Sequence, residues 1–344
     1  MTIYLLVFAG AMVLAIGATP AARWLAPRVG FIDHPEERRI HKRPVPRMGG
    51  AAIYLSVIVA AVILGGRYNF DQFSAILIGA TGVSFMGLVD DRWGVGPFVK
   101  LLGQLAAALL LYASGVTVRT SGIPVLDLGL MLLWVLYITN AINLLDNMDG
   151  LAGGISAIAA AFFALMCAFS GQYLVGALSV AVLGACLGFL FYNLNPASIF
   201  MGDSGSLFLG FVLAAIGIKL RFPNNVTFVT WMVPVLVMGL PIFDTALVTV
   251  SRLRRGLNPL TTPGRDHSSH RLVLSGSTHR EAVLTLYVVS FVLGLLAVFV
   301  TQASVVEGYI VGGLVAVAGL YCLWRAERPP FWFTDTTIEQ PLKE

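Results

Sequence analysis

Residues 173–192 read YLVGALSVAVLGACLGFLFY and contain no charged side chain. A run of about 20 predominantly apolar residues is long enough to cross the hydrocarbon core of a bilayer as a helix. Comparable runs recur along the whole chain. We draw them at approximately 3–25, 49–66, 74–90, 99–115, 128–143, 152–170, 173–192, 205–219, 226–248, 283–302 and 306–324. The pattern predicts an all-α, polytopic membrane protein of about eleven transmembrane helices.

The composition supports a membrane protein. The chain has 344 residues, of which 57% are hydrophobic and 12% are charged, and its mean hydropathy is +0.83. Soluble domains carry about 25% charged residues. The formal net charge of +4 comes from basic residues in the short gaps between apolar runs, which is typical of membrane topology. We therefore expect a lipid bilayer as partner and no nucleic acid.

The distribution of charge predicts the orientation. An odd number of spans places the termini on opposite sides. Only Arg67, Arg119, Lys219 and Arg221, out of 22 Lys and Arg residues, fall in the gaps on one side. The positive-inside rule then gives an outer N-terminus and a cytoplasmic C-terminus. Most acidic residues share the basic side, so we expect an active-site cleft that opens to the cytoplasm. We assign residues 1–325 to a single transmembrane catalytic domain and 326–344 to a cytoplasmic tail.

Two adjacent carboxylates, Asp90 and Asp91, end the third run. Neighbouring carboxylates repel each other, so they need a cation or a proton close by. They suit chemistry with a metal or a phosphate. A charge cluster that only marks the end of a helix is the alternative.

A second polar segment, NLLDNMDG at 143–150, closes the fifth run and opens the sixth. Asp146 and Asp149 are three positions apart, which would place them on one face of a helical turn. Asp149 could serve as a helix N-cap. However, the Asn and Asp side chains here exceed what capping requires in so apolar a chain, and we expect this segment to be functional.

A third segment, FMGDSGS at 200–206, opens the eighth run and sets Asp203 between glycines. Glycines let a ligand approach the backbone closely, and Mg²⁺ is usually held by one or two carboxylates together with substrate phosphates. A turn with a capping Asp or Ser is the alternative. Asp244 lies inside the ninth run, where a carboxylate should face a polar cavity or a partner such as an arginine.

The loop between the ninth and tenth runs carries Arg265, His267, His270 and Arg271. If the segment is helical, the two histidines share a face, and with the arginines they suit phosphate binding. Zinc is a weaker interpretation because no third and fourth ligands have suitable spacing. The basic loop 38–50 could also contact lipid headgroups.

Carboxylates for a metal and cationic side chains for anions, all on one expected face, indicate chemistry on phosphates. A secondary transporter is the alternative from another class, since many spans and Asp244 are typical of one. Transporter sites, however, lie near the bilayer midplane between internal repeats, and we see no repeat. A structural scaffold would explain the spans but not the carboxylates.

The motifs at 47–50 (RMGG), 90–91 (DD), 143–150, 200–206 and 241–245 (PIFDT) resemble those of the polyprenyl-phosphate N-acetylhexosamine-1-phosphate transferase superfamily. The resemblance covers roughly residues 30–275. It is closer to the branch that transfers N-acetylglucosamine-1-phosphate than to the MurNAc-pentapeptide branch.

The resemblance implies that undecaprenyl phosphate attacks the β-phosphate of a UDP-sugar, releasing UMP and leaving a lipid-linked sugar diphosphate. It implies Mg²⁺, with Mn²⁺ as an alternative, and a multi-pass location in the bacterial cytoplasmic membrane. A homodimer stays open. Transfer of phospho-MurNAc-pentapeptide or of another UDP-HexNAc is the alternative within the family.

The resemblance also implies roles for individual residues. Asp203 resembles the Mg²⁺ ligand, and Asp90, Asp91 and His267 resemble catalytic residues. In the family's His-x-His-His motif, His267 and His270 match the outer histidines, whereas Ser269 stands where the family has His. Phe200 resembles the aromatic that stacks on uracil. The implied substrate-binding residues are Lys42, Asn143, Asp146, Asn147, Met148, Asp149, Phe200, Asp244, Arg265 and His270.

Overall fold

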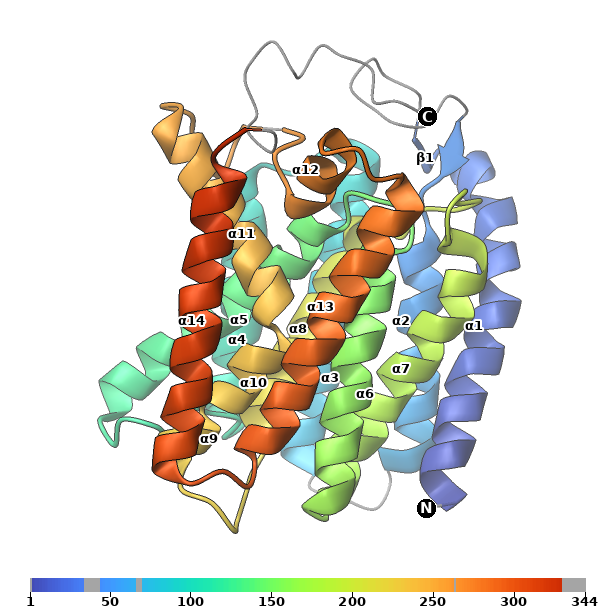
Figure 1. Ribbon diagram of the computed structural model, residues 1–344. Coiled ribbons are helices and arrows are strands. Elements are labelled where there is room, and N and C mark those ends of the chain that lie inside the picture. The colour runs from blue at the N-terminus through green and yellow to red at the C-terminus, as the bar shows by residue number, and fades with distance from the viewer. Residues whose placement is uncertain (1, 34–43, 66–69, 263, 330–344) are drawn as a thin grey trace. The chain divides into compact units, whose positions relative to one another are not determined.

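The computed structural model describes residues 2–33, 44–65, 70–262 and 264–329, and these are almost entirely helical (Figure 1). The chain forms two compact units, Met1–Pro223 and Asn224–Glu344. The expected division into a catalytic domain at 1–325 and a tail at 326–344 stays a prediction.

Unit 1 carries eight helices in its described part and one very short hairpin. The helices are α1 (Thr2–Val29), α2 (Gly49–Gly65), α3 (Phe70–Trp93), α4 (Pro97–Ala113), α5 (Pro124–Leu145), α6 (Leu151–Phe169), α7 (Tyr173–Asn193) and α8 (Gly202–Lys219). The hairpin pairs β1 (Ile32–Asp33) with β2 (Val45–Pro46) in antiparallel register. Unit 2 carries α9 (Thr227–Thr230), α10 (Met232–Val237), α11 (Gly239–Arg254), α12 (Ser268–Leu274), α13 (His279–Val300) and α14 (Val305–Ala326).

Every apolar run expected to cross the membrane contains helix. Within the described ranges, eight helices are long and apolar enough to span a bilayer, namely α1, α3, α5, α6, α7, α8, α13 and α14. The pair Thr227–Val237 and Gly239–Arg254 makes a ninth if it is one span, whereas Gly49–Ile63 and Pro97–Ala113 are apolar but shorter. The protein is thus a polytopic α-helical membrane protein. The count of eleven, the orientation of the termini and the cleft remain predictions.

Helix α8 is the centre of unit 1. Nearly every residue from Gly202 to Ile218 is buried, because α8 packs against α2, α3, α5, α6 and α7. A helix that is apolar on all sides suits the interior of a bundle or a membrane span. Small residues let its neighbours approach, as is usual for helices packed in membranes. At Gly210, for example, a Cβ would lie 2.7 Å from the Cα of Thr139 on α5.

The start of α2 touches the first turn of α8 backbone to backbone. The N–H of Gly50 donates to the carbonyl of Met201 at 2.8 Å, and that of Gly49 donates to the carbonyl of Phe200 at 2.9 Å. A Cβ on Gly50 would collide with the backbone of Gly205. Two facing glycines therefore permit the contact that brings the segment before α2 to the start of α8.

Unit 2 contains a broken span. The run expected as one helix over 226–248 forms α9, α10 and α11, and the helix directions before and after Met238 differ by 71°. Pro241 explains the bend, because proline has no N–H to donate to the carbonyl of Val237 and its ring clashes with that turn. Figure 1 shows α13 and α14 running alongside each other in this unit.

We expect Gly50→Ala to destabilise the protein. A methyl group at this position must push α2 away from α8, and overpacking of this kind typically costs about 1–3 kcal/mol. The measurement is the thermal unfolding midpoint of the purified protein in detergent. Gly82→Ala in α3 is the matched control, since its Cβ would meet nothing within 4 Å. It should leave the midpoint unchanged or raise it, and equal midpoints for both variants would contradict the close packing.

Candidate active site

Asp91 joins three segments at one end of unit 1. It lies near the end of α3, and its carboxylate accepts hydrogen bonds from the N–H groups of Asp203 at 2.9 Å and Ser204 at 3.2 Å. The same carboxylate pairs with Nε of Arg47 at 3.0 Å, and the Asp91 side chain is fully buried. It therefore satisfies N–H groups in the first turn of α8, which have no partner within the helix. Gly202, at φ +73°, leaves room for it.

Both carboxylate oxygens of Asp203 are paired with cations. Oδ1 lies 3.0 Å from Nη2 of Arg47, and Oδ2 lies 3.0 Å from Nζ of Lys100. Arg47 precedes α2 and Lys100 lies in the first turn of α4, so the carboxylate is fixed from two directions. Charge-assisted hydrogen bonds of this kind are short and strong.

Asp90 shares Lys100 with Asp203. Its Oδ2 lies 2.8 Å from Nζ of Lys100, and its Oδ1 accepts from the N–H of Val95 at 2.5 Å. The ammonium group of Lys100 thus lies between two carboxylates that come from the ends of α3 and α8. The adjacent carboxylates of Asp90 and Asp91 are each neutralised by a different cation, Lys100 for Asp90 and Arg47 for Asp91.

This arrangement is compatible with the expected metal. Within the described ranges, no three His, Cys, Asp or Glu side chains gather closely enough to form a metal site by themselves. Mg²⁺ commonly takes one or two carboxylates and completes its coordination with substrate phosphates and water. Asp203 and Asp90 offer hard oxygen ligands on either side of a position that holds the Lys100 cation. The residues therefore fit Mg²⁺ bound together with a substrate.

Arg47, Asp90, Asp91, Lys100 and Asp203 form one cluster. Arg47 and the neighbouring Asp146 have shifted pKa values. Burial raises the pKa of Asp146, just after α5, to about 7, although Arg47 acts in the opposite direction. Burial would lower the pKa of Arg47. However, Asp91, Asp203, Asp146 and Asp90 outweigh this effect, and the pKa lies above its usual value. Arg47 therefore stays charged among carboxylates.

The segment 143–150 contacts the start of α8 and the loop after α7, and it makes an internal hydrogen bond through Asn147. Nδ2 of Asn143 donates to Oγ of Ser206 at 2.9 Å, and Nδ2 of Asn147 donates to the carbonyl of Leu144 at 2.9 Å. Oδ2 of Asp149 accepts from Nδ2 of Asn195 at 3.0 Å and from the N–H of Ala197 at 2.9 Å. Asp149 thereby fastens this turn to the loop that leads to Phe200.

The remaining candidate residues in unit 1 differ in exposure. Met148 is buried, whereas Phe200 is half-buried and its backbone bridges to Arg47. Lys42 lies outside the described residues. The roles of these residues toward a substrate stay predictions.

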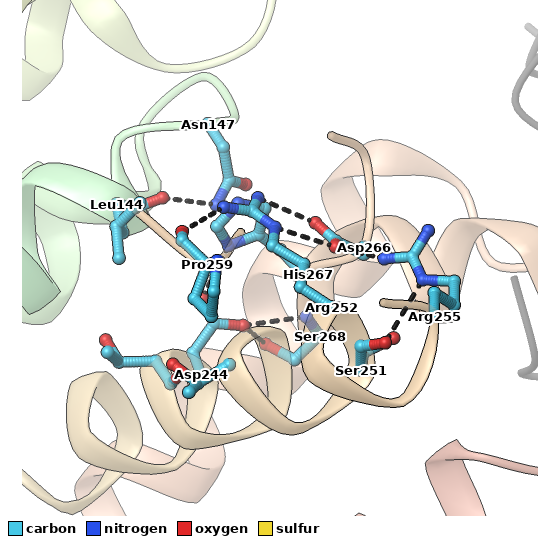
Figure 2. A network of polar contacts seen from close by, with 12 residues as sticks. Leu144, Asn147, Asp244, Ser251, Arg252, Arg255, Pro259, Asp266, His267 and Ser268 are labelled. Atoms are coloured by element: carbon cyan, nitrogen blue, oxygen red, sulfur yellow. Dashed lines mark hydrogen bonds and ion pairs between the residues drawn. The ribbon is translucent and has the colours of Figure 1, made fainter. Parts of the chain in front are cut away.

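In unit 2 the buried carboxylate of Asp244 holds the start of α12 (Figure 2). Oδ2 lies 2.7 Å from Nδ1 of His267, while Oδ1 accepts from the N–H of Ser268 at 2.7 Å and from its hydroxyl at 2.6 Å. The partner of Asp244 is thus a histidine and a helix N-terminus. The contact orients the ring of His267, as carboxylates do for histidines in many sites.

A second group of charges lies at the end of α11 and in the loop after it. Asp266 lies between Arg252 and Arg255 at 3.0 and 2.6 Å, as Figure 2 shows. Burial would raise the pKa of Asp266, but the hydrogen bonds and charge of Arg252 outweigh it and lower the pKa. Arg265, next to this group, is half-buried, and burial lowers its pKa.

His270 lies one turn beyond His267, and the two rings are 5.8 Å apart. Burial, with a further contribution from His267, lowers the pKa of His270 to about 3. Its Nδ1 has no hydrogen-bond partner within the described part of the chain. Ser269, in the position of the family's histidine, is fully buried.

Two cluster residues were not identified as site residues from the sequence. Arg47 belonged to a quoted motif but had no assigned role. Lys100 lies within the apolar run 99–115, where hydropathy alone does not single it out. A lysine within an otherwise apolar helix is itself a functional signal, and that rule would have found it.

Comparisons with known proteins support the family resemblance. A profile described as glycosyl transferase family 4 matches residues 73–221. The chain is 38% identical over 298 residues to a probable undecaprenyl-phosphate N-acetylglucosaminyl 1-phosphate transferase of Bacillus subtilis, over 83% of this chain and 82% of the relative. It is 34% identical to a decaprenyl-phosphate N-acetylglucosaminephosphotransferase of Mycolicibacterium smegmatis, over 80% and 77%. It is 30% identical to a phospho-N-acetylmuramoyl-pentapeptide-transferase of Bacillus cytotoxicus, over 75% and 84%.

We expect Arg47→Met to destabilise the folded protein. Without the guanidinium, Asp91 and Asp203 lose their shared cation, and a lost hydrogen bond to a charged group is worth about 1.5–3 kcal/mol. Arg47→Lys should restore only part of the loss because a lysine cannot bridge two carboxylates in the same fixed geometry. Thermal unfolding in detergent measures both. Arg28→Met is the control, since Arg28 is exposed and contacts the carbonyl and the ring of Trp24 in its own helix.

The lowered pKa of His270 predicts acid sensitivity. The folded state keeps the ring neutral down to pH of about 3, whereas the unfolded chain takes up a proton near pH 6.5. This contribution to stability is therefore fully present above pH 6.5 and is lost as the pH falls. The loss reaches about 2 kcal/mol at pH 5. His270→Gln should lose less stability than the unchanged protein between pH 7.5 and pH 5. An equal loss of unfolding free energy in His270→Gln and in the unchanged protein over this pH range would contradict the prediction.

Proposed function

Because the chain belongs to glycosyl transferase family 4, we propose that it transfers N-acetylglucosamine-1-phosphate from a UDP-sugar to a polyprenyl phosphate. The supporting observation is the similarity to the Bacillus subtilis relative along 83% of this chain. The matched relatives that transfer N-acetylglucosamine-1-phosphate are more similar than the pentapeptide transferase. We place the enzyme in the bacterial cytoplasmic membrane with its site on the cytoplasmic side, because that side holds most of the basic residues.

In the proposed reaction, an oxygen of the lipid phosphate attacks the β-phosphorus of the UDP-sugar. The bond between this phosphorus and the bridging oxygen breaks, and UMP leaves with that oxygen. Both reactants are anions, so the site must offset their repulsion and align them. A phosphomonoester is largely ionised at neutral pH, so the main requirement is positive charge rather than a strong base.

The cluster in unit 1 holds two cationic groups in a fixed geometry, although its three carboxylates outnumber them. Arg47 and Lys100 are the cationic groups, and the carboxylates of Asp91, Asp90 and Asp203 hold them in place. Mg²⁺ held by Asp203 would supply further positive charge beside the diphosphate. We assign Asp90, which Lys100 and Val95 orient, to positioning the lipid phosphate.

In this proposal the histidines of unit 2 bind phosphate. Asp244 fixes the ring of His267, and Arg265 and His270 lie on the same segment. We assign this segment to the phosphates of the nucleotide. Asn147, Met148, Asp149 and Phe200 are assigned to the uracil.

The experiment is release of UMP by the purified protein from a panel of UDP-sugars with undecaprenyl phosphate and Mg²⁺. Release with UDP-N-acetylglucosamine supports the proposal. Release only with UDP-MurNAc-pentapeptide would support the second candidate, for which the Bacillus cytotoxicus relative is the observation. Substrate-dependent transport in proteoliposomes without UMP release would favour a transporter instead.

We expect Asp203→Asn to reduce turnover by about 100-fold or more, because it removes the charge that holds a hard cation at the site. In the unchanged protein, Mg²⁺ with UDP-N-acetylglucosamine should raise the thermal unfolding midpoint, and in the variant it should not. Asp71→Asn is the control, since Asp71 also lies in the first turn of a helix but at the opposite end of α3 from Asp90. Near-normal activity of Asp203→Asn would refute the metal assignment.

A further inference from the structure

Helix α14 is apolar and mostly exposed, yet the residue after it is buried. Within α14 only Gly308 is buried, as expected for a helix that faces lipid on most sides. Glu327, the first residue after the helix, is 7% exposed. A buried carboxylate is unfavourable unless it is paired and hydrogen-bonded. Its burial therefore needs an explanation in its contacts.

Glu327 binds two arginines, of which one is buried. Its Oε1 lies 2.9 Å from Nη2 of Arg271, and its Oε2 lies 3.1 Å from Nη1 of Arg254. The side chain of Arg271 is 2% exposed, whereas that of Arg254 is 59% exposed. Exposed ion pairs contribute little and buried ones are sensitive to the loss of a partner. The contact with Arg271 is thus the one that matters for structure.

Arg271 links α12 to three other parts of unit 2. Besides Glu327, its guanidinium donates to Oγ of Ser251 on α11 at 2.9 Å and to the carbonyl of Asp266 at 2.9 Å. It also donates to the carbonyl of Ala326, the last residue of α14. The side-chain carboxylate of Asp266 is already engaged by Arg252 and Arg255. The carboxylate that pairs directly with Arg271 is therefore that of Glu327.

Helix α12 depends on such contacts. It has seven residues, and helices shorter than about 12 residues are marginal in water without tertiary packing. Asp244 holds its first residue, and Arg271 holds its middle turn. His267 directly precedes Ser268, and His270 directly precedes Arg271. Their placement therefore depends on both.

We propose that Glu327 is a positioning residue that, through Arg271, holds α12 and so orients His267 and His270. This inference rests on the proposed function, in which those histidines serve the phosphates of the nucleotide. It extends the site to the end of the last helix, beyond the residues that carry the family resemblance. Glu327 itself touches no substrate in this proposal.

The test compares Glu327→Gln with Arg254→Gln in the full-length protein. Gln keeps the size of Glu327 but removes the charge that pairs with Arg271, whereas Arg254→Gln removes the exposed partner of the same carboxylate. Hydrogen exchange of the amides in 266–274 measures how firmly α12 is held. Kinetics of UMP release measure the consequence for each substrate.

For Glu327→Gln we expect amide exchange in α12 to increase and kcat/KM for UDP-N-acetylglucosamine to fall, each by about tenfold, because a site loses rate when its supporting contacts loosen. The KM for undecaprenyl phosphate and the exchange of α13 should stay within about twofold of the unchanged protein. Arg254→Gln should alter neither α12 nor turnover. Rescue of part of the loss by Glu327→Asp, which retains the charge, is also expected.

Unchanged exchange in α12 of Glu327→Gln would overturn the proposal, as would an equal effect of Arg254→Gln. Equal losses for both substrates would show support of the whole fold rather than positioning, and would overturn it too. If Glu327→Gln does not fold, the same comparison is made with Glu327→Asp, and exchange in α12 equal to that of the unchanged protein overturns the proposal. If the unchanged protein releases no UMP, the proposed function fails, yet exchange in α12 still decides the role of Glu327.

Discussion

The candidate site in unit 1 depends on the contacts of the Asp91 carboxylate with the start of α8 and with Arg47. This carboxylate is buried, it accepts from two N–H groups of the first turn of α8, and it pairs with Arg47. A carboxylate at a helix N-terminus is stabilised by the unpaired N–H groups and the helix dipole. Because Arg47 also binds Asp203, the same contact sets where Asp203 points. Asp91 thus fixes the position of Asp203 through Arg47.

The two units use one physical device in different ways. In each, a buried aspartate satisfies the N-terminus of a helix and simultaneously binds a basic side chain: Asp91 with Arg47, and Asp244 with His267. The result in each unit is a polar group held at the end of a helix by charge-assisted hydrogen bonds. Such groups lose little freedom when a ligand binds, which is the basis of electrostatic preorganisation.

Hydropathy predicted the helical runs well, because a bilayer leaves a chain segment few alternatives to a helix. It could not predict where a run breaks, as at Met238, where the position of Pro241 decides. The short motifs identified Asp90, Asp91, Asp203, Asp244 and His267 as candidates. The partners of Asp149 and Glu327 lie far away in sequence, and no local pattern indicates such pairs. Lys100 was overlooked because a single charge did not alter the apolar appearance of its run.

The order of the cluster along the chain has a consequence for membrane insertion. Arg47, Asp90, Asp91 and Lys100 all precede residue 101, so two cations and two carboxylates can pair before the later helices are synthesised. This early group is neutral overall, which eases its burial. Asp203 arrives about a hundred residues later with α8 and adds one negative charge. The completed assembly is then short of one positive charge, and this deficit arises only once all its helices are in place.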